Sequence, residues 1–430
     1  MVIIPAMFYR LSRAIEWLIL TAVCFMVLNY SAPRATDEVD RVRAYTRDIE
    51  FDYISWMLNA AGIKIQQGAV GLPGYLDRES SKVVVMDYLH TTQLKMQTED
   101  ALNRLYSDPA IKDKVASSIQ LRADLDKLTR QQNALAPFAE GVLQGQVSQV
   151  AADFGLTLLG QPLPTVLFHS TPVPNALIVS PRDHIEQIAN ISLLPDLTID
   201  QQAALEDRAD KGLNVSSLVV PIGGVGVYPT MIMSTTDLTW LTSTIAHEWT
   251  HNYLEFRPLG LLYDNTPELR TMNETTADIS GGENGAEVLK RYYPELLGDN
   301  IPNLNMLTFP LVHPNPGDMP RPPFDFRAEM HATRVNVDAM LAAGKIADAE
   351  AYMETRRQLF VQNGYYLRKL NQAYFAFYGA YADVPGGAAG EDPVGPAVRA
   401  LRAQSKSLAD FINRISWMTS FAQLQKAVGQ

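Results

Sequence analysis

The sequence predicts an α+β protein that is mostly helical and contains a small mixed sheet. Apolar residues recur at close to helical spacing from about Thr36 to Phe154, and again from Phe326 onward. Between these stretches, short apolar runs bounded by prolines and glycines are typical of strands. The chain has 430 residues, of which 47% are hydrophobic, so it can form one large or two medium domains.

The composition argues against a nucleic-acid partner and excludes a disulfide within the chain. The formal net charge of −11 argues against nucleic acid as a partner. The single cysteine, Cys24, rules out a disulfide within the chain.

Residues 1–32 predict a membrane anchor or a signal segment. Arg10 and Arg13 precede an uncharged run from Trp17 to Tyr30, which is shorter than the roughly 20 residues of a full membrane span. Positive charge ahead of the run favours an N-terminus on the inner side. We therefore expect a single-pass protein of the cell membrane whose catalytic domain is extracytoplasmic. The alternatives are a cleaved signal peptide, which gives a secreted protein, and a helix packed on the folded domain.

Residues 33–154 predict a helical region that forms a stalk or a subdomain. Helices are expected from Ser80 to Leu105 and from Ile111 to Leu135, with a break at Pro109. Acidic and basic residues alternate here as they do on a solvated face. This region therefore indicates no chemistry of its own.

Residues 155–300 begin with the predicted sheet. The strands are expected at Thr165–His169, Asn175–Ser180, Val215–Ile222 and Val225–Met233. A short helix is expected from Asp183 to Ile191, and a second helix is expected to begin at Thr198 as its N-cap.

The stretch that follows the sheet carries the strongest motif in the chain. His247-Glu248-Trp249-Thr250-His251 matches H-E-x-x-H, in a stretch that Asp237 or Thr239 can cap. Residues four apart lie on one face of a helix, so both imidazoles can reach one metal ion. Glu248 is then placed to act on a water molecule at that metal.

A second pattern downstream supplies a third ligand. Catalytic zinc sites usually have three protein ligands and one open position. Asn273-Glu274 and Asp278 belong to a stretch in which the two acids are four residues apart. Asp278 is then well placed to accept a hydrogen bond from the outer nitrogen of a ligand histidine.

These two motifs in this order resemble those of the gluzincin metallopeptidases, the thermolysin-like group, from Thr242 to Asp278. The resemblance implies a zincin-like catalytic domain made of a small mixed sheet and active-site helices. It implies that His247, His251 and Glu274 bind Zn²⁺, that Glu248 is the general base, and that Asp278 orients a ligand histidine.

Other ligand sets fit the sequence less well. The longer metzincin motif requires a glycine at position 254 and a histidine at position 257, where this chain has Leu254 and Arg257. His313 and His331 remain alternative third ligands, but neither lies in a supporting motif. An accidental pair of histidines is the competing interpretation, and the chain contains only seven.

An edge strand beside the metal is expected from Gly224 to Pro229, where Gly226 and Tyr228 would bind the substrate backbone. An ordinary core hairpin is the alternative. Aminopeptidases of the gluzincin group carry a glutamate in the corresponding motif, and the segment from Gly223 to Thr230 has no acid. This departure argues against aminopeptidase specificity, and two alternatives remain: an endopeptidase, or a peptidase that acts on one membrane-proximal substrate.

Residues 301–430 predict a proline-rich connection followed by a C-terminal helical subdomain. Gluzincins carry an oxyanion-stabilising Tyr or His in this part. His331, three residues before Arg334, is the first candidate for that catalytic role; Tyr365, Tyr366, Tyr374 and Tyr378 are the others. The stretch from Leu367 to Tyr381 is also loosely similar to uncharacterised, membrane-associated, aminopeptidase-like proteins of bacteria.

The predicted function is therefore that of a membrane-anchored zinc metallopeptidase that hydrolyses peptide or protein substrates, with a zinc-activated water and Glu248 as general base. Two alternatives remain open. One is a zinc-stabilised, membrane-tethered scaffold or binding protein without turnover. The other is a helical interaction module in which residues 36–150 carry the function.

Overall fold

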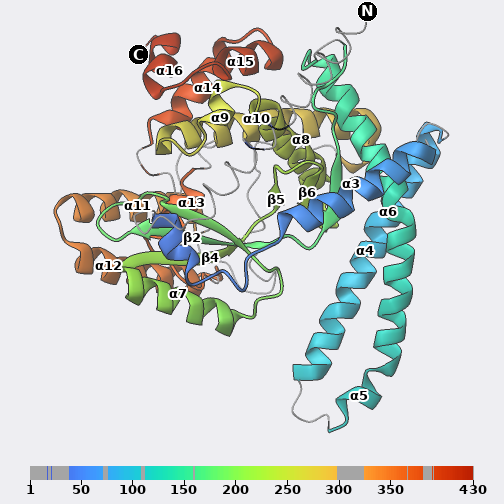
Figure 1. Ribbon diagram of the computed structural model, residues 1–430, viewed down its shortest axis with the longest axis horizontal. Coiled ribbons are helices and arrows are strands. Elements are labelled where there is room, and N and C mark those ends of the chain that lie inside the picture. Colours follow the sequence, from blue (N-terminus) through green and yellow to red (C-terminus); the bar gives the residue numbers. More distant parts are fainter. Residues whose placement is uncertain are drawn as a thin grey trace, which may run out of the picture.

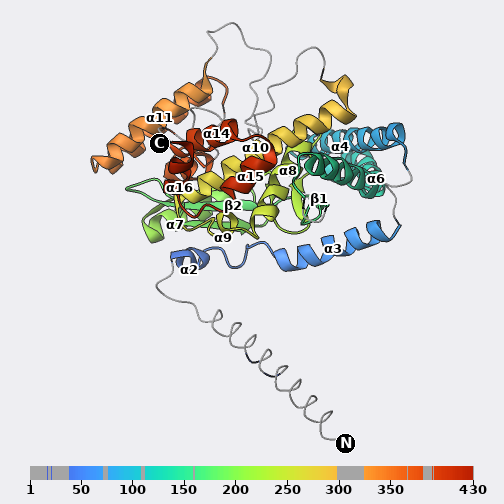
Figure 2. The same ribbon diagram turned by 90° about the horizontal axis from the view of Figure 1, so that it is seen from above.

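A computed structural model describes residues 17, 21, 38–70, 76–107, 112–157, 160–297, 324–365, 367–380, 390 and 392–429. Within them the chain is mostly helical with two small sheets, as the sequence predicts (Figures 1 and 2). The N-terminal helices are α2 (Glu38–Arg43), α3 (Tyr53–Val70), α4 (Arg78–Ser107), α5 (Lys114–Ser117) and α6 (Ile119–Asp153).

Helices α4 and α6 form a long hairpin that extends away from the rest of the molecule (Figure 1). At the base of the hairpin, Val85 and Leu89 of α4 and Val142 and Leu143 of α6 belong to one apolar core. The two helices that carry the sequence motifs contribute to the same core. The predicted helices are present, and α6 runs on past Leu135 to Asp153.

The larger sheet is antiparallel and is buried on both faces. Its strands are β2 (Asn175–Pro181), β3 (Ala189–Leu193) and β4 (Val215–Pro221), in the order β3-β2-β4. Leu177 and Val179 point towards α2 and α7 (Ile199–Leu213), whereas Ala176 and Ile178 point towards the C-terminal helices. Those helices are α11 (Phe326–Ala342), α12 (Ile346–Gln362) and α13 (Gln372–Tyr378). Because side chains alternate along a strand, both apolar sets find a covering layer.

The smaller sheet has the order β1-β6-β5 and lies beside the central helices. Strand β1 (Phe168–Thr171) pairs in parallel with β6 (Thr230–Met233), and β5 (Gly224–Val225) pairs antiparallel with β6. The single strand predicted from Val225 to Met233 is therefore wrong, because the chain turns between β5 and β6. The helix predicted from Asp183 to Ile191 is also wrong, since that segment ends in β3, which pairs with β2.

Two central helices pack against each other and carry both sequence motifs. Helix α8 (Leu238–Leu254) begins at Asp237, whose carboxylate accepts a hydrogen bond from Trp240 N at 3.0 Å, so this predicted cap is confirmed. Helix α10 (Pro267–Tyr292) begins after Thr266, and the short α9 (Pro258–Leu261) lies between them.

Two glycines of α10 allow the backbones of α8 and α10 to approach closely. A Cβ atom at Gly281 would lie 2.7 Å from Ser243 O and 2.9 Å from His247 Cβ. A Cβ atom at Gly285 would lie 2.3 Å from Ser243 Oγ. These distances are shorter than van der Waals contact, so only glycine fits at the crossing.

Three C-terminal helices complete the described chain; the first and the last of them pack on α10, and the second packs on the first (Figure 2). They are α14 (Val394–Gln404), α15 (Leu408–Ile415) and α16 (Phe421–Val428). A one-turn 3₁₀ helix, η2 (Pro294–Leu296), follows α10. Most of the predicted proline-rich connection, up to residue 323, lies outside the described residues.

The segment before α3 pairs with the edge of the larger sheet. Phe51 N donates to Ser192 O at 2.9 Å, and Leu194 N donates to Ile49 O at 2.9 Å. This pairing places Tyr53, the first residue of α3, next to β3. Its hydroxyl lies 2.7 Å from Ser192 Oγ.

A buried charged cluster joins α3, α6 and β1. The Glu140 carboxylate lies 2.5 Å from Lys64 Nζ and 3.0 Å from His169 Nδ1, and it accepts a hydrogen bond from Ser170 N at 2.9 Å. Lys64 and Glu140 are both buried. Contacts of this kind cross the predicted boundary between residues 154 and 155.

The prediction of a single-pass membrane protein with a transmembrane helix is corrected. None of the helices in the described residues has both the length and the apolar character needed to cross a membrane. Residues 1–32, which that prediction concerned, lie outside the described part of the chain except for Trp17 and Thr21.

Candidate metal centre

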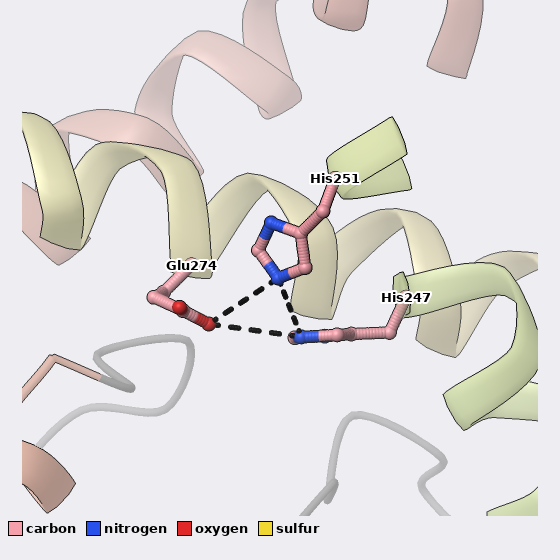
Figure 3. Close-up of side chains that lie close together, drawn as sticks. All are labelled: His247, His251 and Glu274. Atoms are coloured by element: carbon pink, nitrogen blue, oxygen red, sulfur yellow. Dashed lines mark hydrogen bonds and ion pairs between the residues drawn. The ribbon is translucent and has the colours of Figure 1, made fainter. Parts of the chain in front are cut away.

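Three side chains from α8 and α10 converge on one point (Figure 3). The Nε2 atoms of His247 and His251 lie 3.0 Å apart, and each lies 3.6 Å from Glu274 Oε2. The ligand atoms of a tetrahedral zinc site, with bonds of about 2.0 Å, are about 3.3 Å apart. The triangle therefore has the dimensions of one face of a zinc tetrahedron.

The outer nitrogens of both histidines face acceptors. His247 Nδ1 lies 2.8 Å from Asp278 Oδ1. His251 Nδ1 lies 2.8 Å from Asn273 Oδ1, and Asn273 Nδ2 in turn donates to Leu259 O at 3.1 Å. A proton on each Nδ1 leaves the Nε2 lone pairs facing the common point, which is the tautomer that a metal ion requires.

The two oxygens of Glu274 have different environments. Oε1 accepts a hydrogen bond from the Tyr263 hydroxyl. Oε2 is buried, and no described residue offers it a hydrogen bond. Such an orphaned buried acceptor, facing two imidazole lone pairs, fits a divalent cation of the zinc type.

Tyr263 is itself held in place by two neighbours. Its ring meets the His251 ring edge-on, with centroids 6.2 Å apart and planes at 87°. Arg270 Nε lies 3.4 Å from the Tyr263 hydroxyl, and Arg270 Nη1 donates to Ala376 O at 2.9 Å. Helix α13 therefore supports the loop that carries Tyr263.

The pKa values of the ligands His247 and Glu274 are shifted in opposite directions. Burial alone would lower the pKa of His247, but the carboxylates of Asp278 and Glu274 outweigh it and hold that pKa well above its ordinary value. Burial alone would raise the pKa of Glu274, but His251 and His247 outweigh it and hold that pKa well below its ordinary value. In the metal-free centre the carboxylates therefore favour protonation of His247, so protons compete with a metal ion for the site.

Glu248 lies beside the three ligands, against the edge strand β5. A Cβ atom at Gly224 would lie 2.5 Å from Glu248 Oε1, and one at Gly226 would lie 3.1 Å from His251 Cβ. Burial raises the pKa of Glu248, and the neighbouring histidines oppose this only in part. A carboxylate with a raised pKa is a stronger base than an exposed one.

A cavity of about 450 Å³ reaches the ligands and Glu248. Its walls come mainly from α8, β5, α10, β3, α13 and the start of α3, and include Tyr53, Asn190, Val225, Trp240 and Phe377. Tyr53 also interacts electrostatically with Glu248. The N-terminal helical region, which indicated no chemistry in the sequence, thus contributes to the wall of the cavity.

The structure brings together His247, Glu248, His251, Glu274 and Asp278, and it places Gly226 in the cavity wall. It does not bring His331 there: this residue lies on α11 and is not part of the lining. Tyr228 is 40% exposed and also lies outside the lining. Tyr365 packs on the core around α12, and the rings of Tyr374 and Tyr378 contact each other with their planes tilted by 43°. Tyr366 lies outside the described residues.

Sequence reasoning missed four residues of this site: Tyr53, Tyr263, Arg270 and Asn273. Asn273 had a usable signal, because it immediately precedes the third ligand within the second motif. Tyr263 and Arg270 lie between or beside the two motifs, but nothing in their spacing indicated a contact. Tyr53 is distant in sequence, so only tertiary pairing reveals it.

Comparison with known proteins gave no relative, since no family model, curated protein or solved structure matches this chain.

Proposed function

We propose that this protein is a zinc-dependent hydrolase of peptide bonds, of the gluzincin type that its two motifs resemble, with a zincin-like catalytic unit. The observation that carries the proposal is the convergence of His247, His251 and Glu274 beside the buried carboxylate of Glu248. Histidine and carboxylate ligands suit zinc. Zinc, when bound, would polarise the scissile carbonyl and acidify a water molecule.

The protein side chains then divide the remaining tasks. Glu248 would take the proton of the attacking water and deliver it to the leaving amine nitrogen. Asp278 and Asn273 would hold the imidazoles in the tautomer that ligates. The free edge of β5, beside Glu248 and His251, would pair with an extended substrate backbone.

A zinc-stabilised scaffold without turnover is the competing function. Structural zinc sites are normally closed by four protein ligands. Here three described ligands, two histidines and one glutamate, face a cavity, and the residue beside them is the acid Glu248. A structural site has no need for a base in that position, which favours hydrolysis.

The test compares wild type with Glu248→Gln in zinc content and in cleavage of a mixed peptide library. Both proteins are expected to bind one zinc per chain, and only wild type is expected to cleave. Glu268→Gln, which changes an exposed acid on α10 outside the cavity lining, is the matched control and should cleave as wild type does. Zinc in both with cleavage in neither would favour the scaffold. A wild type that takes up no zinc from metal-replete buffer would refute the proposal.

A further inference from the structure

One face of α8, together with the residue that follows its C-terminal end, lines the cavity. Trp240, Thr244, His251 and Glu255 all lie in its wall. The distance from Trp240 to Glu255 along the helix is about 22 Å at 1.5 Å per residue. An extended peptide advances about 3.3 Å per residue, so this face can contact several substrate residues on either side of the ligands.

The acids in this wall differ in their partners. Glu274 faces both histidines and Tyr263, Asp278 faces His247, and Glu248 is the proposed base. Glu255 is the remaining acid of the described lining, and no described residue forms a hydrogen bond or ion pair with its carboxylate. This carboxylate is therefore not paired with any cation among the described residues.

The neighbouring cations are turned to other groups. The guanidinium of Arg257 lies over the Tyr253 ring, 3.5 Å from its centroid, and donates to the Tyr253 carbonyl. Arg270, which also lines the cavity, donates to Ala376 O and approaches the Tyr263 hydroxyl. Neither arginine forms a hydrogen bond or an ion pair with the carboxylate of Glu255.

Glu255 is exposed as a residue, and it lies in the wall of the cavity, where its carboxylate is partly shielded from solvent. Partial burial raises its pKa, and His251, one turn before it, acts in the opposite direction. A partly desolvated carboxylate without a partner is stabilised by any cation that enters beside it.

We propose that Glu255 is a specificity-determining residue that binds a positively charged group of the substrate, an alkylammonium or a guanidinium. The inference rests on the proposed function in taking the ligand to be a peptide. Glu255 follows His251 by one helical turn, a rise of about 6 Å, or about two residues of extended peptide. The cation can therefore be a lysine or arginine side chain near the scissile bond, or the free α-amine of a short peptide.

The experiment measures peptide binding to the zinc-loaded Glu248→Gln protein, which needs no turnover. The probes are two fluorescent hexapeptides, blocked at both ends and identical except for a central lysine or acetyl-lysine. A third probe has a free N-terminus and no lysine, and its N-acetylated form is the reference. The same set is measured with Glu255→Gln added, and with Glu268→Gln added as the control of equal charge change.

We expect the charged member of at least one pair to bind about fivefold more tightly at low salt. Glu255→Gln should abolish the preference, Glu268→Gln should retain it, and added salt should weaken it. The lysine pair identifies side-chain recognition, and the N-terminal pair identifies recognition of the amine.

An unchanged preference in Glu255→Gln, no preference in either pair, or no binding of any probe would each overturn the inference. The proposed function has a separate readout. Cleavage by wild type without a charge preference leaves hydrolysis standing and removes the role of Glu255. A preference that depends on Glu255, in a wild type that never cleaves, supports a cation-binding groove and removes hydrolysis.

Discussion

The Tyr263 hydroxyl donates a hydrogen bond to Oε1 of Glu274, while Oε2 of the same carboxylate faces His247 and His251. The phenol thereby separates the two oxygens into one that is held by the protein and one that is free for a metal ion. Glu274 is prepared to ligate through a single oxygen.

Replacing Tyr263 with phenylalanine should release Oε1 and allow Glu274 to rotate or to ligate through both oxygens. Loss of a residue that orients a ligand typically lowers metal affinity about ten- to a hundredfold. We expect Tyr263→Phe to bind zinc about tenfold more weakly in a chelator competition. In the cobalt-substituted protein, a higher coordination number should weaken the visible absorption.

Tyr228→Phe is the control, because that tyrosine is exposed and lies outside the cavity lining. Equal zinc affinity and an unchanged cobalt spectrum in Tyr263→Phe would show that the phenol does not orient Glu274.

The effect of Asp278→Asn should depend on pH. Asp278 holds the pKa of His247 above its ordinary value, so the substitution lowers that pKa and weakens the competition of protons with metal at low pH. At high pH, where His247 is neutral in both proteins, only the loss of orientation remains. The deficit in zinc affinity should therefore be largest near about pH 9 and narrow towards about pH 6.

Chelator-buffered titrations across that range measure both curves. Parallel curves for wild type and Asp278→Asn would contradict the electrostatic part of this explanation and leave only an orienting role.

Gly281→Ala should disturb the centre without replacing a ligand. The new methyl group would collide with Ser243 O and His247 Cβ, so α8 and α10 must separate. We expect a loss of about 1–3 kcal/mol of unfolding free energy, as for other overpacked sites, together with weaker zinc binding.

Gly145→Ala in α6 is the matched helical control. A Cβ atom there meets nothing within 4 Å, so this change should stabilise by about 0.5–1 kcal/mol. Chemical denaturation gives both values, and a neutral Gly281→Ala would remove the argument for a close crossing.

The buried pair of Glu140 and Lys64 predicts that a double variant is more stable than the single variant Glu140→Gln. Glu140→Gln leaves the Lys64 ammonium buried without its partner, and this should destabilise by about 3–5 kcal/mol. Adding Lys64→Met should recover most of that loss, because the unpaired charge is gone. If the losses of unfolding free energy of the two single variants add up in the double variant, as measured by denaturation, the pair is not coupled.

The same cluster has a defined pH dependence. Burial alone would raise the pKa of Glu140, but its bonds to His169 and Lys64 outweigh it and lower that pKa. A lowered folded-state pKa contributes stability above the unfolded value of about 4.3, and this is lost as pH falls through the folded value. Below about pH 4, wild type should therefore lose more stability than Glu140→Gln does, as measured by denaturation at several pH values.

The sequence predicted the two helices of the metal centre because their signals are local. Asp237 supplies a cap, and the spacings of His247 to His251 and of Glu274 to Asp278 place each pair on one helix face. The capping box of Thr198 with Gln201 is local in the same sense, and the structure contains it.

The errors arose where distant pairing decides the outcome. Strand β3 exists because it pairs with β2, and this overrides the helical appearance of Asp183 to Ile191. His331 stands on a helix, as predicted, but no local pattern states which part of the molecule that helix covers. Tyr53 enters the cavity wall because Ile49 and Phe51 pair with β3.

That pairing of Ile49 and Phe51 with β3 also limits how the gene can be shortened. A fragment cloned from residue 155 would retain both metal motifs but would uncover the outer backbone of β3. An uncovered strand edge offers free amides and carbonyls to a second molecule. Such a fragment should form concentration-dependent aggregates, and useful expression boundaries must include the segment from Glu38 to Tyr53.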